Sequence, residues 1–278
     1  MNNYVHRKVK DRLMTSLSYS ALIIALVPLV SIIVEVVSRG LPAINSSFLF
    51  EEIPPLGQAG GGIGPAILGT IIVVGIASLI GVPIGVVSGI YLAEFRETKL
   101  ALLARFLNDV SSNMPSIVIG IFCWALIVTA IGWSVIAGAV ALAIMMMPVV
   151  TRTTEESLKL VPTTIREAAI ALGIPQWKTT ITVVLSSAKK GIATGILLAV
   201  ARISGETAPL LLTILGSRFW FGGITEPTAA LPLTIFNFSQ SPYTAIDWPR
   251  AWGASMILIL MILGINVIVR YFTREKYG

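Results

Sequence analysis

The sequence predicts an all-α polytopic membrane protein with six transmembrane helices. Of its 278 residues, 55% are hydrophobic and only 12% are charged, which is about half the ~25% of charged residues usual in soluble domains. The mean hydropathy is +0.86. Long charge-free stretches reach the ~20 apolar residues that a membrane-spanning helix needs. This composition excludes a water-soluble domain, a disordered chain and a disulfide scaffold, since there is a single cysteine, Cys123.

The six helices are expected to be centred near residues 25, 80, 123, 142, 202 and 260. Charge-free stretches of 22, 41, 42 and 19 residues support five of them, and the 42-residue stretch holds two helices with a turn at Gly132-Trp133. The fifth helix is expected within the apolar run from Gly191 to Leu215, whose only charges are Arg202 and Glu206. Gly81, Gly85 and Gly89, four residues apart, predict a smooth face for close helix packing.

Basic residues predict the orientation, because Lys and Arg are enriched in cytoplasmic loops. With both termini inside, 16 of the 20 basic residues lie on the cytoplasmic side, 3 lie outside and Arg202 lies within a helix. Net charge +6 is therefore explained by topology, and we expect no nucleic-acid partner. Residues 1–14 are expected to form a cytoplasmic tail, and residues 15–278 one membrane domain with a cytoplasmic loop at about 151–190.

That cytoplasmic loop contains a predicted surface helix. Thr164 and Glu167 have the spacing of a capping box, and a stripe of mainly small apolar residues follows. Gly173 can end the helix and Pro175 can start the next one. Such a helix either lies on the bilayer surface or fits into a groove on a partner. The stripe consists of Ile165, Ala168, Ala169 and Leu172.

The loop resembles the EAA loop of ABC-importer permeases. The resemblance rests on Glu167-Ala168-Ala169, then Gly173, then Val183-Val184-Leu185, although Ser186 stands where that loop typically has proline. Two further stretches, 201–210 and 231–237, are similar to the phosphate-specific branch of that family. The resemblance implies a type I importer permease fold of the MetI-like kind in a bacterial inner membrane. It also implies that residues 165–173 couple to a cytoplasmic ATPase.

Arg202 and Glu206 form the sharpest signal from the residues themselves. With a bilayer boundary near Gly191, Arg202 would lie about 16 Å deep at 1.5 Å per residue. Charges at that depth are costly and usually mark a functional path. Three interpretations stay open: a translocation path, a bridge to another helix or subunit, and a local i,i+4 ion pair. The planar fork of arginine suits phosphate oxygens, and Ser204 and Thr207 can add hydroxyls.

The resemblance implies a permease that performs no chemistry of its own. Its partners would be a second permease subunit, two ATPase subunits that bind ATP and magnesium, and an extracytoplasmic phosphate-binding protein. We expect no cofactor or metal in this chain, because it has one histidine, His6, and no phosphate-binding loop of the G-x-x-x-x-G-K-[ST] type. The alternatives are a permease for another oxyanion, such as sulfate or molybdate, and an ion-coupled secondary transporter.

Overall fold

The computed structural model describes the backbone of residues 2–273 and the side chains of residues 6–271. Within that part of the chain the architecture is all-α, apart from one isolated bridge between Leu215 and Thr228. Five helical segments are long and apolar enough to cross a membrane: 6–43, 64–94, 135–159, 176–204 and 244–271. A sixth candidate is a bent pair, 99–112 with 116–131, whose two parts meet at 103°. Arg274 and Lys276, two of the predicted inside charges, lie outside the described residues.

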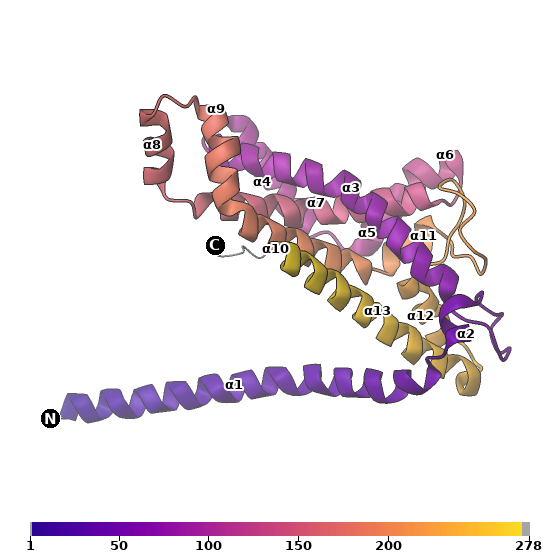
Figure 1. Cartoon of the computed structure of the whole chain (residues 1–278). Helices are drawn as coiled ribbons and strands as arrows, with labels where there is room; N and C mark the ends of the chain where they lie inside the picture. The colour runs from indigo at the N-terminus through magenta and orange to yellow at the C-terminus, as the bar shows by residue number, and fades with distance from the viewer. Residues whose placement is uncertain (1, 274–278) are drawn as a thin grey trace.

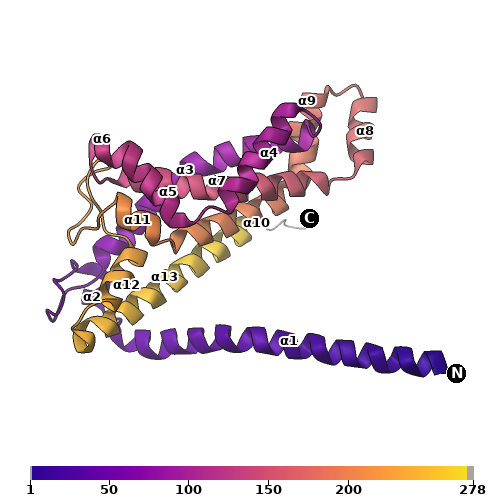
Figure 2. The ribbon, with the colours of Figure 1, turned by 180° about the vertical axis from the view of Figure 1, so that it is seen from behind.

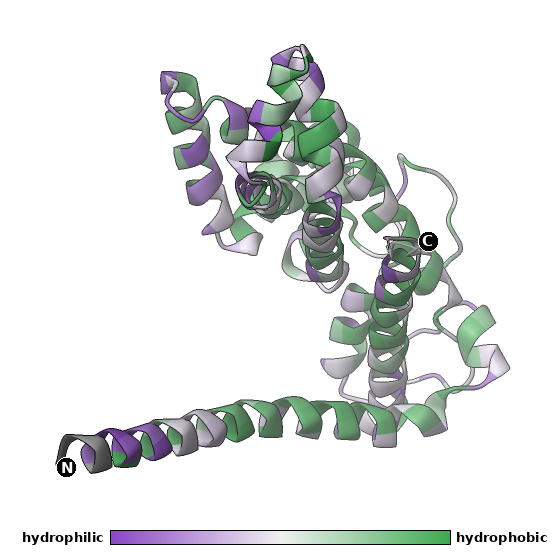
Figure 3. Ribbon diagram, turned by 60° about the vertical axis from the view of Figure 1, so that its left-hand side comes forward, coloured by the Kyte–Doolittle hydropathy of each residue, from purple (hydrophilic) through white to green (hydrophobic). Residues whose placement is uncertain are grey.

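The first helix, α1 (Asn2–Gly40), stands apart from the rest of the molecule (Figures 1 and 2). The predicted tail is helical from Asn2 onward, so it continues directly into the apolar segment. Figure 3 shows hydrophobic residues along most of α1 and hydrophilic ones near its N-terminus. In its most apolar window only 6% of residues are buried. It joins the body at its C-terminal end, where α1 and the 3-10 turn η1 (Leu41–Ala43) pack on α13 (Thr244–Thr273).

The body is built around α3 (Gly64–Glu94) and α7 (Val135–Lys159), which make the most extensive helix contact in the described chain. The glycine strip makes this approach possible, as predicted. A Cβ added at Gly85 would lie 2.7 Å from Val150 Cβ, and one at Gly89 would lie 2.6 Å from the carbonyl oxygen of Thr151. Contacts this close admit only a hydrogen at these two positions. Helices α5 (Ser116–Cys123), α10 (Leu185–Ser204) and α11 (Ala208–Thr213) complete this core.

The expected third helix is bent. The sequence predicts one helix centred near residue 123, whereas the chain forms α4 (Lys99–Ser112), turns at Asn113–Pro115 and continues as α5. Pro115 caps α5 with φ −57° and ψ 133°, and the residue preceding a proline is disfavoured in the α region. A π-helical stretch, η2 (Trp124–Val128), and α6 (Thr129–Ile131) follow, and Gly132 makes the predicted turn with φ 85°.

The two ends of the molecule differ in content. One end carries α8 (Thr163–Ala171), α9 (Gln176–Lys178), the N-terminal end of α1 and the C-terminal end of α13 (Figure 1). The other carries α2 (Ser46–Phe50), α6 and α12 (Leu231–Ser239), together with the loops at 51–63 and 214–230. This arrangement places the N-terminal end of α1, the C-terminal end of α13 and α8 toward the same end of the molecule. The side of the membrane that this end faces stays a prediction.

Candidate functional site

The predicted site at Arg202 lies at a break in the fifth helical segment. That segment begins at Gln176, passes through the π-helical stretch η3 (Thr179–Val184) and ends with α10 at Ser204. Gly205 is the C-cap residue of α10, and α11 begins at Ala208 with Pro209 in its first turn. Proline has no amide hydrogen to donate to the carbonyl of Gly205, which favours a break at this point. The prediction of a helix centred near residue 202 is therefore wrong: Arg202 lies in its last turn.

The four predicted residues are brought together at this break, with different environments. The Arg202 Nε and Glu206 Oε1 atoms are 4.0 Å apart, and the side chains are 50% and 20% exposed. Ser204 is buried and its Oγ donates to the carbonyl of Val200 at 2.7 Å, so its hydroxyl is directed into its own helix. Thr207 is the N-cap residue of α11 and makes no capping hydrogen bond through its side chain. Of the four predicted residues, Arg202, Glu206 and Thr207 therefore have polar side-chain atoms that could contact a ligand.

The pair therefore has the geometry of a loose ion pair beside an interrupted helix. A separation of 4.0 Å is the limit of a salt bridge, and exposed pairs contribute only about 0–1 kcal/mol. Fold stability gives little reason to place these charges here. An exposed guanidinium at a helix break can instead present its donors to an anion or to a neighbouring subunit. The depth of Arg202 in a membrane stays a prediction, and so does its role as a contact for an anion or for a neighbouring subunit.

The second predicted element, the loop helix α8, begins earlier than the capping-box spacing requires. Its N-cap residue is Pro162, no side chain caps it, and Thr163 is its first residue. The capping box of Thr164 and Glu167 is therefore wrong, since both residues lie inside the first turns. The predicted end is confirmed: Leu172 is the C-cap residue, Gly173 has φ 79°, and Pro175 caps α9.

The predicted apolar stripe of α8 is partly buried against the protein and partly exposed. Ala169 is buried at 6% exposure, and α8 packs on η3. Leu172 is 81% exposed and Ile165 38%, while Ala168 and Glu167 are also exposed. Nearby apolar side chains share this exposure, namely Leu160, Ile170 and Trp177. An end of the molecule with this many exposed apolar groups has the character of a contact surface.

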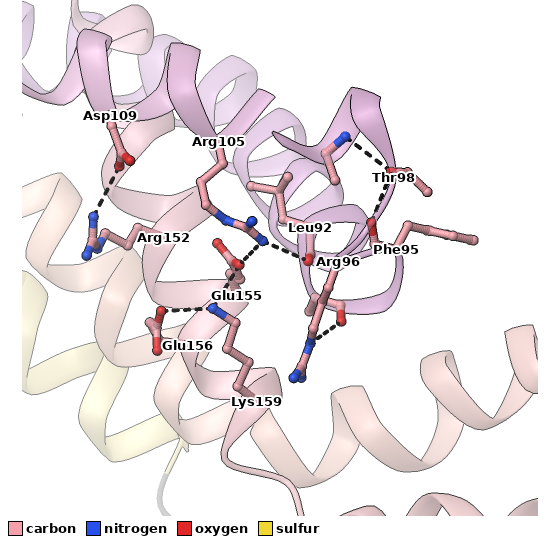
Figure 4. A network of polar contacts seen from close by, with 12 residues as sticks. Leu92, Phe95, Arg96, Thr98, Arg105, Asp109, Arg152, Glu155, Glu156 and Lys159 are labelled. Atoms are coloured by element: carbon pink, nitrogen blue, oxygen red, sulfur yellow. Dashed lines mark hydrogen bonds and ion pairs between the residues drawn. The ribbon is translucent and has the colours of Figure 1, made fainter. Parts of the chain in front are cut away.

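Ionic contacts at the α8 end were missed by the sequence reasoning. Figure 4 shows Arg105 of α4 between α3 and α7: its Nη2 lies 2.7 Å from Glu155 Oε1, and Lys159 Nζ lies 2.9 Å from the same oxygen. Arg152 and Asp109 pair at 3.2 Å nearby. Arg166 of α8 pairs with Glu94 at the end of α3. From the sequence, these basic residues indicated only the orientation of the chain in the membrane. The three arginines pair with acidic residues 43 to 72 positions away, and only the Lys159–Glu155 pair is local.

A further buried charge cluster lies at the opposite end. Asp247 is fully buried and accepts hydrogen bonds from the Gly57 amide at 2.9 Å and from Ser241 Oγ at 2.5 Å. Arg250 reaches Asp247 at 3.2 Å and the carbonyl of Gly60 at 2.5 Å. The cluster fastens the 51–63 loop to α13, beside a cavity of 980 Å³ between that loop and residues 215–240. The i,i+3 spacing of Asp247 and Arg250 was its only sequence signal.

Comparison with known proteins identifies the family. Residues 81–275 match the family described as "Binding-protein-dependent transport system inner membrane component". This range includes the break at Arg202, α8 and the ionic contacts at Glu94 and Glu155. The chain belongs to this family. It is therefore an inner-membrane permease subunit of a binding-protein-dependent transport system, as the EAA-like loop predicts.

Relatives within this permease family extend over nearly the whole chain. The "Phosphate transport system permease protein PstA" of Haemophilus influenzae is 44% identical over 97% of this chain and 96% of its own length. The protein of the same name from Yersinia pestis is 41% identical over 98% and 92%. The "Probable phosphate transport system permease protein PstA" of Methanocaldococcus jannaschii is 36% identical over 97% and 95%.

Solved structures of other importers share the permease fold. A chain of the MetNI methionine ABC transporter, captured facing inward, superposes with a TM-score of 0.57 at 19% identity and covers 77% of this chain and 95% of its own length. A bacterial ABC transporter involved in the import of the acidic polysaccharide alginate gives 0.60 at 14% identity and covers 95% and 100%. The predicted MetI-like fold is thus confirmed.

Proposed function

We propose that this permease carries inorganic phosphate across the cytoplasmic membrane as part of an ATP-driven importer. The observation that carries the proposal is the near-full-length similarity to phosphate transport permeases, at up to 44% identity with the relatives named above. A likeness restricted to the coupling loop would fit any importer of this family. Here the similarity also covers the break at Arg202 and the 214–240 region.

The proposed assembly contains three kinds of partner. A second, PstC-like permease subunit would share the translocation path, and a PstS-like receptor would deliver phosphate from outside. Two PstB-like ATPase subunits would supply the motion, with one of them bound to the exposed surface of α8. Both termini and α8 would then face the cytoplasm. The proposed coupling residues are Ile165, Glu167, Ala168 and Ala169 of α8, its C-cap residue Leu172, and Gly173. ATP hydrolysis belongs to the partner subunits, and this chain contributes motion and a path.

Arg202 is the proposed phosphate contact on the path. Its guanidinium keeps a positive charge and offers paired donors to phosphate oxygens. Glu206, 4.0 Å away, offsets part of that charge, so that phosphate binds strongly enough to enter and weakly enough to leave. Thr207 adds a hydroxyl at the same break. Ser204 has the weaker claim, because its hydroxyl already donates to Val200.

A substrate screen tests the proposal. The importer is reconstituted in proteoliposomes, and ATP hydrolysis is measured with the receptor loaded with phosphate, with sulfate or with molybdate. Stimulation by phosphate alone, together with uptake of radiolabelled phosphate, is the expected result. Stimulation by sulfate or molybdate without a phosphate response would instead assign the permease to another oxyanion. Anion uptake driven by an ion gradient without ATP would indicate a secondary transporter.

A further inference from the structure

Arg166 links the surface helix α8 to two helices of the membrane body. Its Nη1 pairs with Glu94 Oε1, on the last residue of α3, and its Nη2 donates to the carbonyl of Leu158 in the last turn of α7 at 3.3 Å. The two charged side chains are only 19% and 9% exposed. One guanidinium therefore contacts both α3 and α7 from the middle of α8.

The helices that Arg166 contacts are already fixed to each other. The glycine strip of α3 lies directly on α7, and the carbonyl oxygen of Thr151 is 2.6 Å from where a Cβ of Gly89 would be. Arg105 adds α4 to the same group through Glu155 at 2.7 Å. At the same ends of α3 and α7, one apolar cluster buries Leu158, Val161 and Val184 together. A displacement delivered to the ends of α3 and α7 therefore moves a connected group of helices.

The connections of α8 along the chain are less direct. It is preceded by a turn at Leu160–Pro162 and followed by Gly173, whose positive φ reverses the chain before α9. Through that second turn α8 leads into η3 and then α10, which ends at the Gly205 break. Pairing to Glu94 gives α8 a second route, onto α3, that bypasses both turns.

We propose that Arg166 is a positioning residue of energy coupling in this permease. The ion pair with Glu94 holds α8 rigidly to the ends of α3 and α7, so that a push on α8 moves these helices together, and the break at Gly205 takes up the change in angle. The inference rests on the proposed ATP-driven function. Stability alone explains the pair poorly, because partly buried ion pairs recover little more than their desolvation cost.

Substitution at both ends of the pair tests this role. Arg166→Ala and Glu94→Gln are expected to lower substrate moved per ATP hydrolysed by about 2- to 30-fold, the range for residues that transmit coupling, while the ATPase still co-purifies. The exchange of Arg166→Glu with Glu94→Arg should recover part of the ratio. Arg152→Ala is the matched control, because it breaks an exposed pair, 65% and 50% exposed, at the same end. An unchanged ratio in Arg166→Ala would overturn the proposal.

A cross-link separates this inference from the identity of the substrate. Cysteines replace Glu94 and Arg166 in a Cys123→Ser background, and a bifunctional thiol reagent of matching span joins them in the assembled complex. If α8 and α3 move as one body, the linked complex keeps its ATPase turnover, which is measured without any transported anion. Loss of turnover on linking, restored by a cleavable reagent, means that the two segments must separate, and the proposal fails. Failure of phosphate uptake in the unmodified importer would count against the proposed function only.

Discussion

The Arg105 guanidinium on α4 lies 2.7 Å from the Glu155 carboxylate on α7 (Figure 4), at the end of the molecule that carries α8 (Figure 1). Glu155 is nearly buried, with 6% of its side chain exposed, and it also receives Lys159 at 2.9 Å. Arg105 reaches the carbonyl of Leu92 on α3 as well, at 3.5 Å. One arginine thus holds the first half of the bent helix pair against the α3–α7 core.

Arg105→Ala is expected to destabilise the permease by about 1.5–3 kcal/mol, the usual worth of a hydrogen bond to a charged group. Lys159 stays beside Glu155 and limits the loss. Arg152→Ala, which breaks the exposed pair with Asp109, is expected to cost at most about 1 kcal/mol. Thermal unfolding in detergent, followed by labelling of the buried Cys123 thiol, measures both. Equal unfolding temperatures for the two variants would contradict this ranking.

Gly85→Ala is expected to disturb the contact between α3 and α7. The added Cβ would lie 2.7 Å from Val150 Cβ, and overpacking of this kind typically costs about 1–3 kcal/mol. Gly75→Ala on the same helix is the control, because no atom lies within 4 Å of its Cβ position and alanine favours a helix more than glycine does. The Cys123 labelling assay should show a lower transition temperature for the first variant alone.

The elements that depend on local pattern were predictable from the sequence. Charge-free length located the helices, and the four-residue glycine spacing gave the α3–α7 contact. Features set by contacts between distant segments were not predictable. The ion pair of Arg166 with Glu94 joins residues 72 positions apart. The bend after α4 has a local cause in Pro115, but its angle of 103° was not predictable from that residue alone. The misplaced fifth helix has a local cause: the apolar run from Gly191 to Leu215 suggested a centre near residue 202, whereas Gly205 and Pro209 interrupt the helix there.

Gly173→Ala is expected to weaken coupling through α8 by straining its C-terminal turn. Gly173 has φ 79° and open space around its Cβ position, so the cost is conformational, about 1–2 kcal/mol for an L-residue. Gly173→Asn is the control, since asparagine tolerates this conformation best among the other residues. Substrate transported per ATP should fall for alanine and stay closer to wild type for asparagine. The same ratio in both variants would mean that the turn has no mechanical role.

Arg202→Gln is expected to reduce phosphate uptake by about 10- to 150-fold, which corresponds to the loss of a charge-assisted hydrogen bond of about 1.5–3 kcal/mol. Assembly should be unaffected, because Arg202 is half exposed and its ion pair is long. Uptake into vesicles and co-purification of the ATPase are measured side by side. Full transport by the variant would exclude Arg202 from the path. Loss of co-purification would favour a bridge between subunits.

The isolation of α1 leaves its tilt undetermined by the fold. The helix is anchored at one end, where Gly40 lets it approach the backbone of Trp252 and Arg39 lies 5.5 Å from the Trp252 ring. Over most of its remaining length apolar side chains are exposed. Bilayer thickness, or the neighbour against which α1 lies, must therefore set its angle. Lipids of different chain length should turn it about Gly40 while the other helices keep their mutual arrangement.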